Sequence, residues 1–316
     1  MEVVIGPEHA AASEPGAAVT IGAYDGVHLG HRRLIATLQS MAAPRQLETA
    51  VVTFDRHPAT VVRPQSAPLL LTDLEQKLEL LDAAGVDRTV VVPFDEARAN
   101  ETAEDFVDEV LVDALRARLV VVGEDFHFGH GRKGNVALLT ETGNRRGFEV
   151  VGLGLEADPA GEVVSSTRIR RLLGAGDVGA AARLLGRHHQ VRGIVVHGDG
   201  RGAAELGYPT ANVDVPPAVA LPGDGIYAAW YERPGGAVHP AAVSVGRRPT
   251  FHSRQEVPLL EAFVLDFDGD LYGEQARVSF VARLRDELRF TEVGDLVAQM
   301  GRDVTAARAV LADGPP

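Results

Sequence analysis

The strongest constraint on the fold is a series of short, valine-rich apolar segments that alternate with helical patterns from residue 17 to about residue 186. Near-continuous apolar runs are typical of strands that are covered on both faces. Between them, leucines recur at helical spacing, as in DLEQKLELLDAAG, which ends on Gly85, a plausible helix C-cap. This β-α-β-α-β rhythm predicts a parallel sheet with helices on both faces. The expected strands are 17–22, 49–54, 88–94, 118–123 and 148–153.

The rhythm changes near Gly186–His189. Beyond this point strand-like segments are separated by turns rich in proline and glycine, with no helical pattern until about residue 292. This predicts a small antiparallel barrel or sandwich, closed by a final amphipathic helix over roughly 292–312. A chain of 316 residues is long enough for two domains. The predicted domains are 1–186 and 187–316, and the predicted fold class is α/β followed by a small antiparallel β-barrel with a terminal helix.

Composition excludes several classes of function. The net charge of −13 argues against nucleic acid as a partner, because binding needs a basic face to neutralise phosphates. The chain has no cysteine, which excludes disulfides, thiolate nucleophiles and cysteine-type zinc sites. No apolar run is long enough for a membrane span, and the N-terminus lacks the pattern of a secretory signal. We therefore expect a cytoplasmic protein with no membrane partner, and the sequence leaves open whether it forms a homo-oligomer.

The segment GAYDGVHLGH, residues 22–31, joins the first expected strand to the first expected helix. Ligands bind at the carboxyl ends of strands in such sheets, and a helix N-terminus favours phosphate. Gly22 and Gly30 allow the backbone to approach a ligand, and His28 and His31 add donors for charge that builds on phosphorus. The alternative is a glycine-rich turn whose histidines cap and pack. The context favours the ATP-handling loop of an enzyme that transfers an adenylyl group.

Two further segments suit polyphosphate. GEDFHFGHGRKG follows an expected strand end and gathers glycines with Asp125, Arg132 and Lys133. SSTRIRR opens an expected helix with hydroxyl groups and arginines, a combination that also fits an ordinary helix cap. Together with GAYDGVHLGH and TFDRHP, these segments resemble the adenylyltransferase half of bacterial bifunctional riboflavin kinase/FAD synthetases over most of residues 17–186. The resemblance implies a Rossmann-like nucleotidyltransferase domain with catalytic His28 and His31. It also implies an ATP and FMN site made by Gly22, Asp25, Gly30, Asp125, Ser166, Thr167 and Arg168.

The most informative stretch of the second domain is GDGRGAAELGYPTANV, residues 198–213. Its glycines allow a tight loop that approaches phosphates. Thr210 and Asn212 are oxygen-bearing side chains two residues apart, so both can point the same way in an extended segment and suit Mg²⁺. The residues predicted to bind ATP or flavin here are Gly198, Gly202, Gly207, Pro209, Thr210 and Asn212.

Glu261 interrupts the apolar strand LLEAFVL, where a carboxylate is costly unless it has a task or a partner. A general base that takes a proton from a substrate hydroxyl is such a task, and an edge-strand glutamate that faces water is the alternative. In the following DFDGDLYG, the D-x-D-x-D spacing suggests calcium, but the twelfth position is Arg277, so we predict a hairpin turn at Asp268–Gly269 instead.

PTAN, Glu261 and DFDGDLYG resemble the riboflavin kinase half of the same family over roughly residues 188–300. The resemblance implies a six-stranded barrel with Thr210 and Asn212 on MgATP and Glu261 activating the ribityl hydroxyl. The expected function is phosphorylation of riboflavin to FMN and adenylylation of FMN to FAD, with ATP, riboflavin, FMN and FAD as the ligands. Two departures are Tyr24, where the family usually has Phe, and Arg248, where it often has Asn. Arg248 motivates an alternative: an FMN adenylyltransferase with a kinase-impaired, flavin-binding barrel. A non-catalytic flavin sensor is the rival from another class.

Overall fold

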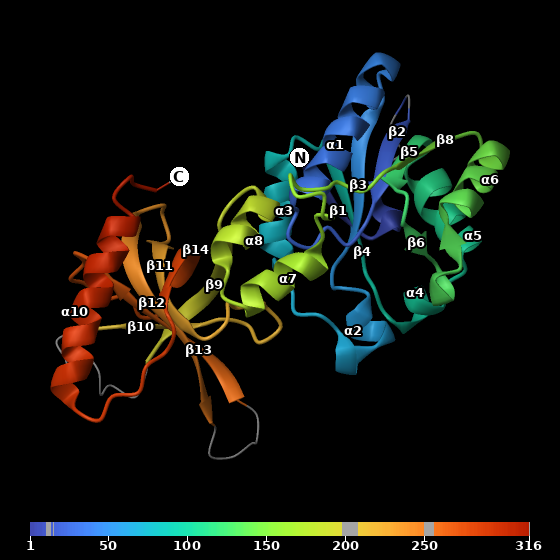
Figure 1. Cartoon of the computed structure of the whole chain (residues 1–316). Helices are drawn as coiled ribbons and strands as arrows, with labels where there is room; N and C mark the ends of the chain where they lie inside the picture. Colours follow the sequence, from blue (N-terminus) through green and yellow to red (C-terminus); the bar gives the residue numbers. More distant parts are fainter. Residues whose placement is uncertain (11–13, 15, 198–207, 250–255, 316) are drawn as a thin grey trace. The chain divides into compact units, whose positions relative to one another are not determined.

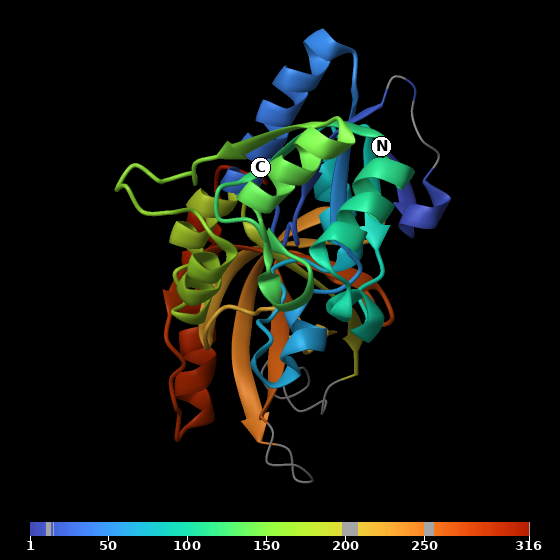
Figure 2. The ribbon, with the colours of Figure 1, turned by 90° about the vertical axis from the view of Figure 1, so that its right-hand side faces the viewer.

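The computed structural model describes residues 1–10, 14, 16–197, 208–249 and 256–315, and for residues 247–249 and 256–258 it describes the backbone alone. The chain forms two compact units, Met1–Ser166 and Thr167–Pro316, which are shown from two sides in Figure 1 and Figure 2.

The first unit contains a parallel sheet whose strands, in the described residues, lie in the order β1-β4-β3-β2-β5-β8. The strand bounds are Glu2–Ile5 (β1), Ala17–Ile21 (β2), Glu48–Phe54 (β3), Arg88–Val92 (β4), Ala117–Gly123 (β5) and Glu149–Leu153 (β8). The principal helices are α1 (Leu29–Ala42), α3 (Leu74–Ala83), α5 (Ala103–Phe106) with the π-helix η4 (Val107–Ala114), and α6 (Val136–Arg146). Shorter elements are η1 (Pro7–His9), η2 (Ala43–Arg45), α2 (Ala59–Val62), η3 (Pro64–Ser66), α4 (Glu96–Asn100), β6 (His127–Phe128), η5 (His130–Arg132) and β7 (Gly134–Asn135).

Helices cover both faces of this sheet, as predicted. Val19 and Val120 belong to a core cluster that includes Leu111 of η4. Their chain neighbours Ala18 and Leu119 pack on the other face, against residues of α1. Successive side chains of a strand point to opposite faces, so these near-continuous apolar runs fill two cores at once. The strand order reverses between β2 and β5, which is where ligands bind in open sheets of this kind.

Strand β1, at the edge of the sheet, was not predicted from the sequence. Glu2–Ile5 pairs in parallel with β4, but only Val4 of the four residues is buried, with the pattern exposed, exposed, buried, exposed. A strand this short, with one buried side chain, lacks the continuous apolar signal of the inner strands.

The second unit contains a closed antiparallel barrel with the strand order β10-β13-β12-β11-β14-β9 in the part of the chain that is described. The strand bounds are His189–Val196 (β9), Ala211–Asp214 (β10), Gly225–Glu232 (β11), Val238–Pro249 (β12), Glu256–Val264 (β13) and Gln275–Arg285 (β14). The helices are α7 (Ser166–Gly174), α8 (Val178–Leu185) and α10 (Val293–Val310). Helix α10 packs on the barrel through Ala307, which lies in a buried cluster with Ala228 and Trp230 of β11 (Figure 1).

The hairpin predicted at Asp268–Gly269 is wrong. β13 pairs with β10 and β12, whereas β14 pairs with β11 and β9, so residues 265–274 connect strands that are not neighbours. The Asp-Gly dipeptide indicated a turn, but it does not reveal which strands pair.

Contacts place the division between the units at Ser166–Thr167, because α7 and α8 pack with the barrel. Gly223 N donates to Leu173 O of α7 at 2.8 Å, and α8 contacts β9 and β14. The boundary between functional domains at 186 and 187 stays a prediction.

Candidate active sites

The loop between β2 and α1 has a tightly constrained backbone. Gly26 has φ +85°, and the non-glycine residues Tyr24 and Val27 have φ of +50° and +37°. The conformations of Tyr24 and Val27 cost about 1–3 kcal/mol each and persist only where packing enforces them, whereas glycine adopts a positive φ readily. Both side chains are buried, and the Tyr24 hydroxyl lies 2.7 Å from Thr20 Oγ1. The loop is therefore held in one shape from within.

Asp25 anchors this loop to a second segment of the unit. Its Oδ1 accepts hydrogen bonds from Leu71 N at 2.8 Å and Thr72 N at 3.2 Å, and Gly26 N donates to Thr72 Oγ1 at 3.1 Å. Ser166 Oγ donates to the Asp25 carbonyl oxygen at 2.9 Å. Ser166, the last residue of the first unit, thus lies against this loop, residues 22–28, which we call the histidine loop. The described contacts give Asp25 a structural role, and its predicted part in ligand binding stays a prediction.

His28 and His31 form a stacked pair at the start of α1. His28 is the N-cap residue, and its Nδ1 accepts from His31 N at 3.4 Å. The ring centroids are 3.7 Å apart with planes 15° from parallel. A methyl group on Gly30 would lie 3.2 Å from His28 Cε1, so glycine leaves room for the ring.

The pair is poorly suited to carry positive charge. Burial lowers the pKa of His31 well below its usual range, and repulsion from His28 and Lys77 lowers it further. His31 Nδ1 is buried and, among the described residues, has no hydrogen-bond partner. His31 is therefore neutral near pH 7, and it can serve as a hydrogen-bond donor or acceptor rather than as a cation.

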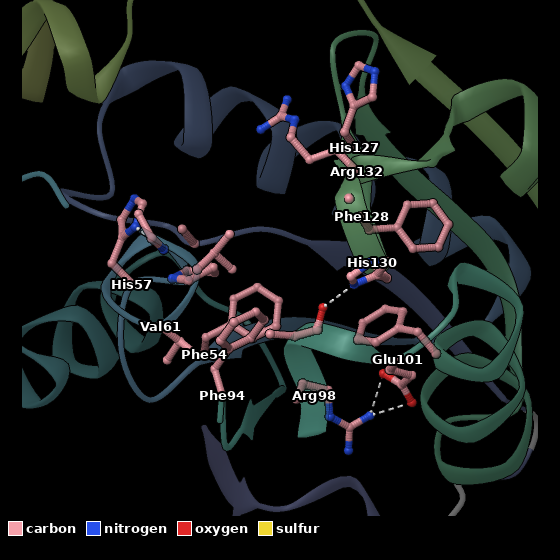
Figure 3. A pocket seen from close by; sticks show the side chains of 18 of the residues that line it. Phe54, His57, Val61, Phe94, Arg98, Glu101, His127, Phe128, His130 and Arg132 are labelled. Carbon is pink, nitrogen blue, oxygen red and sulfur yellow. Dashed lines mark hydrogen bonds and ion pairs between the residues drawn. The ribbon is translucent and has the colours of Figure 1, made fainter. Parts of the chain in front are cut away.

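A cavity of about 750 Å³ opens at the carboxyl ends of β2, β3, β4 and β5 (Figure 3). Its walls carry two aromatic pairs: the rings of Phe54 and Phe94 meet edge to face at 5.2 Å, and those of Phe126 and Phe128 stack at 5.3 Å. Aromatic walls around a volume of this size suit a flat, conjugated ligand. These side chains were not predicted from the sequence as site residues, because each one taken alone resembles an ordinary core residue.

Polar groups surround the same cavity. His57, His127, His130 and Arg132 line it, as Figure 3 shows. Arg98 also lines it, but ion pairs to Glu101 and Glu109 engage its guanidinium and raise its pKa. Arg132, by contrast, is exposed and makes none of the ion pairs found among the described residues.

Not all of the predicted adenylyltransferase residues line this cavity. Gly22 and Asp125 do, whereas His28, the N-cap of α1, and Gly30 and His31 in its first turn are outside its lining. Thr167 and Arg168 follow Ser166 in α7 but are grouped with the second unit. Their contribution to the adenylyltransferase site stays a prediction.

The barrel brings Asn212 and Glu261 together. They are direct cross-strand partners between β10 and β13, and Glu261 also pairs with Ser244 of β12. Side chains directly opposite on antiparallel strands lie about 4.5–5.5 Å apart at Cβ. Asn212 and Glu261 are half-buried, while Ala211 and Val213, which point to the other face of β10, are buried. A carboxylate and an amide therefore share one face of the barrel.

The rest of the predicted kinase site is only partly described. Pro209 is exposed and Thr210 half-buried, both immediately before β10. Gly198, Gly202 and Gly207 lie outside the described residues. Arg248 pairs with Val257 in the β12–β13 ladder, and its side chain is outside the described part.

No group of three or more His, Cys, Asp or Glu residues positioned to hold a metal ion occurs among the described residues. Mg²⁺ needs no such group, since it takes one or two protein oxygens together with phosphates and water. The Asn212 amide oxygen and the Glu261 carboxylate share one face of the barrel, and the Thr210 hydroxyl belongs to the residue two positions before Asn212, so the residues present offer oxygen donors of the kind that Mg²⁺ takes.

Comparisons with known proteins match both units. Residues 10–168 match the family model for FAD synthetase, and residues 185–311 match that for riboflavin kinase. A bifunctional riboflavin kinase/FMN adenylyltransferase of Escherichia coli K12 is 38% identical over 298 residues, which cover 94% of this chain and 93% of the relative. The relative of the same name from Listeria monocytogenes is 37% identical over 297 residues, 93% of this chain and 92% of its own.

A crystal structure from Streptococcus pneumoniae, described as a macrolide-efflux protein, has the same fold. It superposes with a TM-score of 0.86 at 30% identity and covers 98% of this chain and 99% of its own. In the described part of the present chain, every helix is too short or too polar to cross a membrane.

Proposed function

The chain belongs to the bifunctional riboflavin kinase/FMN adenylyltransferase family, and we propose that it phosphorylates riboflavin to FMN with MgATP and then adenylylates FMN to FAD with a second ATP. The observation that supports a kinase activity beside the adenylyltransferase is the register of the barrel, which sets Glu261 beside Asn212. A barrel that only bound flavin would have no need of a carboxylate next to a predicted MgATP residue.

In the kinase reaction, the Glu261 carboxylate takes the proton of the terminal ribityl hydroxyl. That oxygen attacks the γ-phosphorus of ATP, the bond from the γ-phosphorus to the bridging oxygen breaks, and ADP leaves. Thr210 and Asn212 would hold Mg²⁺, which neutralises phosphate charge when bound. The half-buried position of Glu261 supports this role, because a general base works best where water is partly excluded.

In the transferase reaction, the FMN phosphate is already a nucleophile and needs no base. Its oxygen attacks the α-phosphorus of ATP, and pyrophosphate leaves. His28, His31 and the free N–H groups at the start of α1 stabilise the charge that develops on the phosphorus oxygens. A neutral His31 supports a donor role, since it offers an N–H without adding a charge that the stacked His28 would oppose.

We place the isoalloxazine ring of FMN in the aromatic cavity of the first unit. The aromatic rings of Phe54 and Phe128 would pack against the isoalloxazine ring. Asp125 and Arg132 belong to the segment that follows β5 and also line the cavity. Gly22 connects the cavity to the histidine loop, so the phosphate end of FMN would point toward α1.

Incubation with riboflavin and MgATP, followed by chromatographic identification of flavins, tests the proposal. FMN and then FAD are the expected products. FAD formed from supplied FMN, with no FMN formed from riboflavin, would favour the alternative of a kinase-impaired barrel that Arg248 motivates. Absence of both products would favour a flavin-binding protein without catalysis.

Three statements about location, partners and oligomeric state stay predictions: the protein is cytoplasmic, it has no nucleic-acid or membrane partner, and a homo-oligomer is an option. The ligands ATP, riboflavin, FMN and FAD follow from the family.

A further inference from the structure

Lys77 of α3 is a buried cation that the two proposed reactions leave without a task. Its side chain is 7% exposed, and its ammonium donates to Phe54 O at 2.7 Å, Thr53 Oγ1 at 3.2 Å and Ala23 O at 3.3 Å. All three acceptors are neutral. None of the ion pairs among the described residues includes Lys77.

A buried ammonium without a bonded counter-ion is expensive to maintain. Burial lowers the pKa of Lys77 to about 8, although the carboxylates of Asp25 and Asp55 oppose this change. The ammonium form still predominates at pH 7. The unit therefore keeps a positive charge at this place, in a chain whose net charge is −13.

The charge lies under the adenylyltransferase site. Ala23 belongs to the histidine loop and Phe54 ends β3, and both line the aromatic cavity. Thr53 Oγ1 also donates to Ala23 O at 3.2 Å, so the carboxyl ends of β2 and β3 are joined through one small network. The field of Lys77 reaches His31, whose pKa it helps to lower.

Lysine is the suitable residue for this position. Its three N–H donors can be directed to three separate acceptors, whereas the planar guanidinium of arginine forms a fork that suits carboxylates. The chain otherwise relies on arginine: of its 31 basic Lys and Arg residues, only Lys77 and Lys133 are lysines.

We propose that Lys77 is a positioning residue for adenylyl transfer, which fixes the ends of β2 and β3 and supplies positive charge beneath the site where two anionic substrates meet. This inference rests on the proposed function of the first unit. The charge favours the close approach of the FMN phosphate to the α-phosphate of ATP, which is the reacting geometry.

The first experiment compares Lys77→Met, which keeps the length of the side chain and removes its charge, with Glu79→Gln on the exposed face of the same helix. We expect Lys77→Met to lower kcat for FAD formation from supplied FMN by about 10- to 100-fold. The KM for FMN should change less, and FMN formation from riboflavin should match the wild type. Glu79→Gln should match the wild type in both reactions. Loss of the folded structure of the first unit in Lys77→Met, seen by far-UV circular dichroism under assay conditions, would show a folding role and would overturn the proposal, as would equal loss of both activities or full FAD formation.

The second experiment isolates the charge and uses the absence of cysteine from the chain. Lys77→Cys is alkylated in guanidinium chloride with 2-bromoethylamine or with 2-bromoethanol and then refolded, alongside wild type treated in the same way. The first reagent restores an ammonium at position 77, and the second installs a hydroxyl group on a chain of equal length. Far-UV circular dichroism, which reports on the first unit as well as on the barrel, measures the refolded fraction in each sample.

We expect the aminoethyl product to recover FAD formation per refolded molecule and the hydroxyethyl product to remain impaired. Equal recovery with both reagents would show that Lys77 only fills space and bonds, and it would overturn the proposal. If the treated samples do not regain the wild-type circular dichroism, Lys77→Met purified in native form decides between the two outcomes. Failure of wild-type protein to make FAD from supplied FMN would refute the proposed function instead, which keeps the two outcomes distinct.

Discussion

Replacement of Asp25 by alanine should destabilise the first unit selectively. Asp25 is 5% exposed, and its Oδ1 accepts from the backbone N–H groups of Leu71 and Thr72, which are 1% and 4% exposed. In Asp25→Ala both donors lose their acceptor in a place that water does not reach. Each buried, unsatisfied group costs about 1–3 kcal/mol, so the free energy of unfolding of the first unit should fall by about 2–6 kcal/mol. Asp25→Asn keeps an acceptor oxygen. It should lose less than half of the stability that Asp25→Ala loses, because only the contribution of the charge to the two hydrogen bonds disappears.

Urea unfolding can follow the two units separately. The single tryptophan, Trp230, lies in β11 of the barrel, so its fluorescence reports on the second unit, whereas far-UV circular dichroism reports on both. With an m-value of about 2 kcal/mol/M, the loss in Asp25→Ala lowers the midpoint of the first unit by about 1–3 M. The fluorescence midpoint should not move.

Activity at low urea gives a second measure. FAD formation from supplied FMN should fall in Asp25→Ala because the histidine loop is no longer fixed, while FMN formation from riboflavin persists. A variant that loses FAD formation but unfolds at the wild-type midpoint would refute the reasoning. Asp25 would then contact ligand rather than anchor the loop.

Three further outcomes are expected. Glu261→Gln should lower FMN formation from riboflavin by about 100- to 10,000-fold, and FAD formation from supplied FMN should be preserved, as flavin chromatography can show. Burial lowers the pKa of His189 to about 4. The unfolded chain takes up a proton below about pH 6.5 and the folded barrel does not, so the stability of the barrel should fall by up to about 3 kcal/mol between pH 6.5 and 4. Trp230 fluorescence in urea at each pH measures this, and His189→Gln should flatten the dependence. Tyr24→Phe, which removes the bond to Thr20, should cost about 1 kcal/mol in the circular dichroism transition and leave FAD formation intact.

Much of the architecture follows from local patterns. The inner strands of the sheet carry an apolar signal strong enough to place them within a few residues, because they fill a core on each face. Turn chemistry was less informative. Asp268–Gly269 marks a change of direction, but strand pairing over the barrel depends on contacts between residues far apart in sequence. The edge strand β1 was missed because only Val4 is buried in it.

The sequence pattern also indicated some of the residues proposed for the sites and not others. His28 and His31 could be selected from their place at a strand–loop–helix junction, a pattern that also fits histidines that cap and pack, and their catalytic role stays a prediction. Lys77 could not, since a lysine inside a leucine-rich helical pattern usually faces solvent. Its task becomes visible only when α3 is packed beneath the ends of β2 and β3.

The two sites also depend on their scaffolds in different ways. In the first unit, parallel strands bring Phe54, at the end of β3, and Phe94, after β4, to one edge of the sheet, so the cavity depends on strand order. In the barrel, Asn212 and Glu261 meet through register alone. A slip of one residue between β10 and β13 would turn one of them to the opposite face of its strand. The kinase site should therefore be sensitive to a single inserted residue in β10 or β13, whereas the transferase site should be sensitive to the network that joins strand ends.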